Sequence, residues 1–185
     1  MREEVGGRVR VYMASSLDGY IAGPDDDLSW LHEHETGASN EKEEGVSYED
    51  FLADIGVMLM GRRTFDVVSD FVPWPYDDLP IRVVTHRTIE NPPGKVEAVS
   101  GTIEEIIEDA KVAAGARDIY LDGGSLIRQA LVAGLVDEMI ITYLPVVLGG
   151  GVTLFGELDS RLDFTFESHH DFHHRMLQVR MIPQR

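Results

Sequence analysis

Two glycine turns in the sequence could bind phosphate groups. Gly61-Arg62-Arg63-Thr64 follows the apolar run 55–60, and Gly123-Gly124-Ser125 follows the run 118–122, and a helix-like segment comes after each turn. Such a turn offers free backbone N–H groups where a phosphate can approach without meeting a Cβ atom. Arg62 and Arg63 add fixed charge suited to a sugar phosphate, whereas the uncharged second turn suits a pyrophosphate. Each turn alone could equally be only a tight connection, and the two together favour an anion site.

The segments around these turns predict an α/β fold. Strands are expected over residues 8–15, 55–60, 81–86, 96–99, 118–122, 138–148, 163–168 and 175–182. Helices are expected near 48–55, from the first glycine turn to 69, over 103–114 behind a Thr102 cap, and over 126–132. Strand–helix units come first and a hairpin last. This order predicts one domain over residues 1–185, with a mixed, mostly parallel sheet of about eight strands, helices on both faces and a C-terminal antiparallel hairpin.

The stretch between the first two strands is expected to be irregular. Asp-Gly, Gly-Pro and three consecutive Asp residues predict a long loop over 16–30. From residue 25 onward, closely spaced acids indicate a solvated acidic loop that leads into the short helix near 48–55.

Composition excludes several classes of function. The chain has 185 residues, with 16 Lys and Arg against 33 Asp and Glu, and its formal charge of −17 repels nucleic acid and anionic membranes. It has no Cys, which excludes disulfides, thiolate zinc sites and cysteine nucleophiles. The first residues are charged, and no apolar run approaches the roughly 18 residues of a membrane span. We therefore expect a cytoplasmic protein that acts on a small molecule.

Four segments resemble reductases of the dihydrofolate reductase-like superfamily. MLMGRRTFDVV resembles the cofactor segment of dihydrofolate reductases. SLDGYIAGPDDDLSWL, IYLDGGSLIRQAL and LVDEMIITYLPVVLGGGVTLF resemble the C-terminal reductase domain of the bifunctional riboflavin biosynthesis protein. The resemblance covers nearly the whole chain from about residue 9. It implies a dihydrofolate-reductase-like three-layer fold that binds NADPH across the carboxyl ends of its strands.

The resemblance also implies which residues bind the cofactor. The family's segment that binds the adenosine phosphates, including the 2′-phosphate that distinguishes NADPH from NADH, corresponds to Gly61, Arg62, Arg63 and Thr64. The edge that holds the adenine ribose matches Thr85, His86 and Arg87. The pyrophosphate turn matches Gly123, Gly124, Ser125 and Leu126. The strand end and loop that close over the nicotinamide match Met13, Ala14, Asp18, Gly19 and Ile21.

The substrate side of the site depends on an acid. Hydride transfer to a C=N or C=O group needs a nearby group that steers or supplies a proton. One candidate is Asp18, whose alternative is an ordinary turn residue. The other is Glu49, chosen among four acids before the Gly61 turn (Glu43, Glu44, Glu49 and Asp50), none of which matches the folate enzymes' spacing without a gap. Trp30 could stack on a flat heterocycle or belong to the core.

The leading interpretation is an NADPH-dependent reductase that resembles 5-amino-6-(5-phosphoribosylamino)uracil reductase, because SLDG, DGGS, LVDE and PxxLGGG belong to that branch. Its substrate would be a small heterocycle or a sugar-derived imine. Dihydrofolate reductase is one alternative, and a non-catalytic NADPH-binding module is another. A homodimer is expected from the family. No metal is expected, because adjacent histidines in a strand (His169, His170, His173, His174) point to opposite faces.

Overall fold

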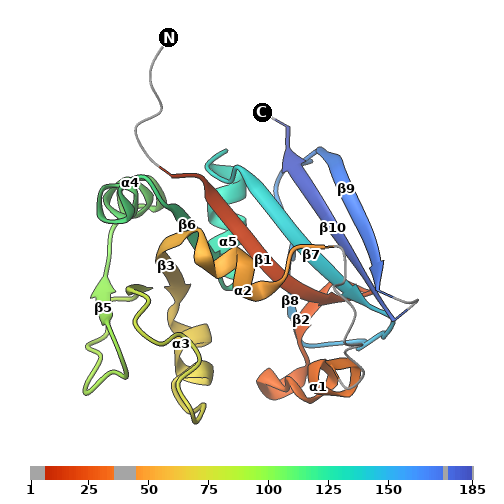
Figure 1. Cartoon of the computed structure of the whole chain (residues 1–185), viewed down its shortest axis with the longest axis horizontal. Coiled ribbons are helices and arrows are strands. Elements are labelled where there is room, and N and C mark those ends of the chain that lie inside the picture. Colours follow the sequence, from red (N-terminus) through yellow and green to blue (C-terminus); the bar gives the residue numbers. More distant parts are fainter. Residues whose placement is uncertain (1–6, 36–44, 173–174, 185) are drawn as a thin grey trace.

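An eight-stranded sheet forms the centre of the protein (Figure 1). The computed structural model describes residues 7–35, 45–172 and 175–184. In spatial order the strands are β5 (Val96–Val99), β4 (Ile81–Val84), β3 (Ile55–Gly61), β6 (Asp118–Asp122), β1 (Val9–Ser16), β7 (Glu138–Leu144), β10 (Met176–Pro183) and β9 (Phe164–Phe172). The pairs from β5 to β7 are parallel, and β10 is antiparallel to both β7 and β9. The predicted mixed sheet with a terminal hairpin is confirmed.

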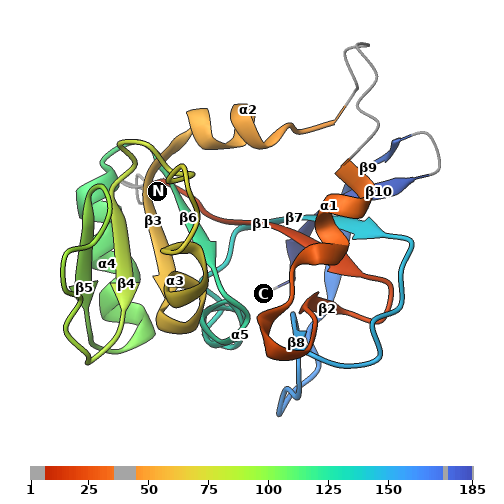
Figure 2. The same cartoon turned by 90° about the horizontal axis from the view of Figure 1, so that it is seen from below.

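Helices cover both faces of this sheet (Figure 2). α4 (Ile103–Ala114) and α5 (Gly124–Val132) pack against one face, where β3 contributes Val57 and Leu59. α2 (Tyr48–Ala53) and α3 (Arg62–Val68) pack against the other face, where β3 contributes Met58 and Met60. Because β3 is buried on both sides, its sequence is continuously apolar rather than alternating. The predicted Thr102 cap is present as a full capping box with Glu105.

Two predicted strand ends lie beyond those observed. β7 ends at Leu144 instead of residue 148, and the next residue is Pro145, which has no N–H to donate to a neighbouring strand. β4 ends at Val84 instead of residue 86, although the Thr85 N–H still donates to the Val99 carbonyl, 2.9 Å away.

The prediction of a long loop after β1 is wrong. This segment forms β2 (Tyr20–Ala22), which pairs with β8 (Val152–Thr153), then the 3₁₀ turn η1 (Pro24–Asp26) and helix α1 (Ser29–Glu35). The Asp27 carboxylate accepts hydrogen bonds from the Ser29 N–H and hydroxyl at 3.1 and 2.9 Å, which satisfies donors at the start of the helix. The aspartates that indicated a loop therefore serve a turn and a helix start. Residues 36–44 of the predicted acidic loop lie outside the described residues.

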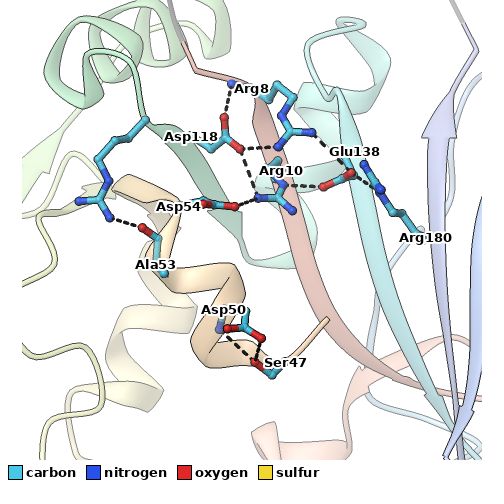
Figure 3. Close-up of polar contacts among 10 residues, drawn as sticks. Arg8, Arg10, Ser47, Asp50, Ala53, Asp54, Asp118, Glu138 and Arg180 are labelled. Atoms are coloured by element: carbon cyan, nitrogen blue, oxygen red, sulfur yellow. Dashed lines mark hydrogen bonds and ion pairs between the residues drawn. The ribbon is translucent and has the colours of Figure 1, made fainter. Parts of the chain in front are cut away.

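A cluster of charged side chains lies at the amino ends of the central strands (Figure 3). Glu138 of β7 is fully buried and accepts hydrogen bonds from Arg10 of β1 and Arg180 of β10. Asp118 of β6 accepts from the Arg8 guanidinium at 2.9 Å and from Arg10 at 3.2 Å. A buried charge that loses its partner is strongly destabilising, so these pairs fix how β1, β6, β7 and β10 align.

Within the described part of the chain, no helix is both long enough and apolar enough to cross a membrane.

Candidate functional site

A pocket of about 450 Å³ lies at the carboxyl ends of β1, β3, β4 and β6. In open α/β sheets this edge is where ligands bind. The apolar part of its wall comes from β1, the β2–β8 pair, α1 and the residue before it, α3, the end of β4 and α5. These residues are Met13, Ala14, Ile21, Ala22, Leu28, Leu31, Val67, Val68, Val84, Leu126 and Val152. Figures 1 and 2 show α1, α3 and the small β2–β8 sheet gathered at this end of the main sheet.

Both glycine turns predicted from the sequence line this pocket, and they lie against each other. A Cβ atom on Gly123 would stand 2.8 Å from Thr64 Oγ1 and 3.5 Å from the Gly61 nitrogen. Gly123 also has φ +99°, a conformation that side chains rarely adopt. A Cβ atom on Gly124 would stand 2.8 Å from the Thr153 carbonyl oxygen of β8. Glycine at position 123 therefore lets the two turns close into one cradle, and glycine at position 124 lets the second turn approach β8.

Two cationic side chains of α3 stand beside the cradle. Arg62 and Arg63 line the pocket. Arg62 Nε donates to Asp66 Oδ1 at 2.7 Å, and Arg63 Nε donates to Asp26 Oδ1 of η1 at 2.7 Å. The Asp26 pair joins α3 to the segment after β2 across the pocket wall, because Asp26 is itself a lining residue.

A buried acid stands inside the pocket, at the end of β6. Asp122 lines the cavity, is only 9% exposed, and accepts a hydrogen bond from the Gly123 N–H at 2.7 Å. Burial raises its pKa to about 6, against the opposing effect of that hydrogen bond. Burial, with added repulsion from Asp122, also raises the pKa of Tyr48, Tyr76 and Tyr120. A carboxyl that titrates this close to neutrality inside a pocket is suited to exchanging a proton with a ligand.

Comparisons with known proteins identify the family of this chain. The RibD C-terminal domain matches residues 8–177. The chain belongs to this family. A solved structure of a putative riboflavin biosynthesis protein from Shewanella sp. PV-4 is 35% identical, with a TM-score of 0.82, over 96% of this chain and 99% of that one. The chain therefore has the fold of a RibD C-terminal domain over nearly its whole length.

More distant structures show the same fold at low identity. A Thermotoga maritima protein named diaminohydroxyphosphoribosylaminopyrimidine deaminase/5-amino-6-(5-phosphoribosylamino)uracil reductase is 16% identical, with a TM-score of 0.66, over 97% of this chain and 57% of that one. Dihydrofolate reductase from Enterococcus faecalis, complexed with NADP(H), is 15% identical, with a TM-score of 0.57, over 98% of this chain and 99% of that one. The predicted dihydrofolate-reductase-like fold and the resemblance to the riboflavin reductase domain are confirmed.

In this RibD-type domain, most of the residues expected to bind a cofactor meet in the one pocket: Ala14, Ile21, Gly61, Arg62, Arg63, Thr64, Gly123, Gly124, Ser125 and Leu126 all line it. Gly19, Thr85, His86 and Arg87 lie outside the pocket wall. Gly19 is a turn residue with φ +85° whose carbonyl accepts from the Leu154 N–H. Arg87 donates to Asp66 at 3.1 Å and so stands beside Arg62. Their roles in binding stay predictions.

Asp18 lies outside the pocket wall and fixes a loop. Its carboxylate accepts hydrogen bonds from the Ser16 hydroxyl at 2.7 Å and from the Leu148 and Gly149 N–H groups at 3.1 and 2.8 Å. The Ser16 hydrogen bond, with the two backbone donors, lowers the pKa of Asp18 to about 2. It is ionised at neutral pH and ties the turn after β1 to the loop after β7. A role in proton transfer stays a prediction, and these contacts favour the turn interpretation.

Glu49 and Trp30 also lie outside the pocket wall. Glu49 is exposed in the first turn of α2. Trp30 of α1 is buried at 4% exposure, while its neighbour Leu31 lines the pocket. Their roles toward a substrate stay predictions. Of the four acids weighed for the proton, Glu43 and Glu44 fall outside the described residues. Sequence reasoning missed Asp122, although an acid between a buried strand and a glycine turn was visible in the sequence.

In the described part of the chain, no group of three or more His, Asp or Glu side chains lies close enough together to hold a metal ion. His169 and His170 lie on β9, and His170 packs its ring against Phe172 at 4.5 Å. His173 and His174 lie outside the described residues.

Proposed function

We propose that this protein is an NADPH-dependent reductase, acting on a small heterocyclic or sugar-imine substrate like that of 5-amino-6-(5-phosphoribosylamino)uracil reductase. The observation that carries the proposal is the shared pocket, in which two glycine turns close on each other between cationic side chains and a buried acid of raised pKa. The family membership and the names of the solved relatives support the same reaction class.

The chain's own residues fit such a cofactor. Gly123 and Gly124 leave room for a pyrophosphate beside the backbone, at the start of α5. Arg62 and Arg63 supply the charge for the adenosine phosphates. The apolar wall around Ala14 and Ile21 suits the nicotinamide ring and keeps water from it. When bound, NADPH would supply the hydride.

We assign the role of proton donor to Asp122. Reduction of a C=N or C=O group leaves a negative charge on nitrogen or oxygen, which a neighbouring acid can neutralise. The pKa of Asp122, about 6, keeps a protonated fraction available near neutral pH, whereas Asp18 with a pKa of about 2 holds almost none. Asp122 also lines the pocket and Asp18 does not.

A fluorescence titration with NADPH and NADH at matched ionic strength tests the cofactor. Arg62→Ala should weaken NADPH by on the order of tenfold or more and NADH much less, because only NADPH carries the extra phosphate. Equal losses would move the phosphate site away from Arg62. Failure of the wild type to bind either nucleotide would refute the cofactor assignment.

Hydride transfer is tested by following NADPH absorbance with pyrimidine and pterin substrates. Turnover with a ribosylaminopyrimidine supports the proposal, and turnover with dihydrofolate alone would favour dihydrofolate reductase instead. Tight NADPH binding without turnover of any substrate would favour a non-catalytic binding module. The single-domain boundary, the homodimer and the cytoplasmic location expected from the sequence stay predictions.

A further inference from the structure

One carboxylate joins two arginines beside the pocket. Asp66, on α3, accepts from Arg62 Nε through Oδ1 at 2.7 Å and from Arg87 Nη2 through Oδ2 at 3.1 Å. Arg62 is one helical turn before Asp66, whereas Arg87 belongs to the segment after β4, 21 residues away. Arg62 Nη1 also donates to the Thr88 carbonyl at 3.3 Å, so the same two segments are joined twice.

The bridge holds two like charges together. Two guanidinium groups that share one carboxylate repel each other, and each is a long side chain that loses rotamer freedom when fixed. The Arg87 side chain is 66% exposed, and the hydrogen bond to Asp66 ties it to α3. Hydrogen bonds and charge from Arg62 and Arg87 lower the pKa of Asp66, so it keeps its charge at neutral pH.

The bridge leaves binding capacity in both arginines. Arg62 uses Nε and Nη1 in the contacts described, and Arg87 uses Nη2. Each guanidinium has five N–H donors, so several donors remain for a ligand. With two cations and one anion, the group keeps a net positive charge. Such a pair of planar donors, fixed in direction, suits a phosphate dianion better than one mobile arginine does.

We propose that Asp66 is a positioning residue that holds Arg62 and Arg87 as a paired grip for the 2′-phosphate of NADPH, and thereby sets the preference for NADPH over NADH. This inference depends on the proposed function, because it concerns the same cofactor. Asp66 itself touches no phosphate. Its carboxylate acts through the two arginines. Charge alone would predict the opposite effect on phosphate binding, because a carboxylate repels a nearby phosphate.

The test is binding by calorimetry to two pairs of ligands, NADPH against NADH and adenosine 2′,5′-bisphosphate against AMP. Asp66→Asn should weaken NADPH and the bisphosphate by on the order of tenfold and leave NADH and AMP unchanged. Asp66→Glu, which keeps the charge and can reach both arginines, should restore most of the affinity. Asp163→Asn is the control, because Asp163 also accepts from an arginine, Arg161 at 2.6 Å, and lies outside the pocket wall.

A second comparison separates positioning from charge. In an Arg87→Ala background, Asp66→Asn should no longer weaken the bisphosphate tenfold, because there is no second arginine to hold. Unchanged or tighter NADPH binding by Asp66→Asn in the otherwise normal protein would overturn the inference and leave the proposed function intact. If the wild-type protein binds NADPH and NADH equally, this inference is overturned but NADPH binding is not. If it binds neither nucleotide, both this inference and the proposed NADPH binding are refuted.

Discussion

The buried Asp122, which we propose as the proton donor, should lower the unfolding free energy of the protein at neutral pH. Its pKa rises from an ordinary value of 3.8 to about 6 because it is buried, so the folded protein disfavours the charged form. The difference corresponds to about 3 kcal/mol of unfolding free energy once the pH is above both values. Asp122→Asn removes the charge and keeps an oxygen that can accept from the Gly123 N–H. We therefore expect the variant to be more stable than the wild type at neutral pH.

The pH dependence identifies the cause. The unfolded chain releases this proton near 3.8, whereas the folded protein holds it to about 6, so raising the pH through this window favours unfolding. The advantage of Asp122→Asn over the wild type should grow from about 1 kcal/mol near pH 4.5 to about 3 kcal/mol near pH 8. Other titrating groups are common to both proteins and cancel in this difference.

Urea unfolding followed by circular dichroism at several pH values measures the difference directly. Asp163→Asn, which removes one charge from an exposed site, controls for the general effect of the net charge of −17. A stability advantage that does not change with pH would refute the argument from burial. The variant should also lose most of its reductase turnover while keeping its NADPH affinity, if Asp122 provides the proton.

Four other substitutions test the architecture. Gly123→Ala should destabilise the fold and weaken nucleotide binding, because the new Cβ atom would stand 2.8 Å from Thr64 Oγ1. Gly134→Ala is the control, since Gly134 has φ +67° and an added Cβ atom would meet no atom within 4 Å. It should lower the unfolding free energy, measured by thermal unfolding, only by the backbone strain of about 1 kcal/mol. Glu138→Gln should lower the unfolding free energy by about 3 kcal/mol, since the buried Arg10 and the half-buried Arg180 both lose the carboxylate that accepts from them. Asp18→Asn should speed hydrogen exchange at the Leu148 and Gly149 amides; unchanged exchange would mean that the carboxylate does not hold that loop.

The parts of the fold with strong periodicity could be predicted from the sequence. β3 and β6 are short apolar runs that end at glycines, and α4 has both a capping box and an apolar stripe, so local pattern and tertiary burial agree there. Both glycine turns were recognisable in the sequence as strand-to-helix turns, but their contact through Gly123 and Thr64 depends on β3 and β6 being neighbours in the sheet, which no local pattern encodes.

The features that the sequence did not predict depend on contacts between residues far apart in the chain. α1 has few apolar residues in an acidic stretch, and Trp30 is buried only because the rest of the molecule provides a place for it. Asp122 looks like any strand end until its burial is known, since its raised pKa comes from burial in the folded protein. Asp66 belongs to an ordinary amphipathic helix in the sequence, and only the fold brings Arg87 to it.

The position of β1 also determines when the pocket can form. β1 is the first strand of the chain, yet its neighbours are β6 and β7, with Val9 opposite Ile119 and Val11 opposite Met139. During synthesis the segment 55–99 can pair its own three strands, while β1 must wait until more than a hundred further residues have been made. The pocket uses residues from β1, β3 and β6, so it appears only with this late closure of the sheet. A ligand can therefore stabilise the finished protein but cannot guide its early folding.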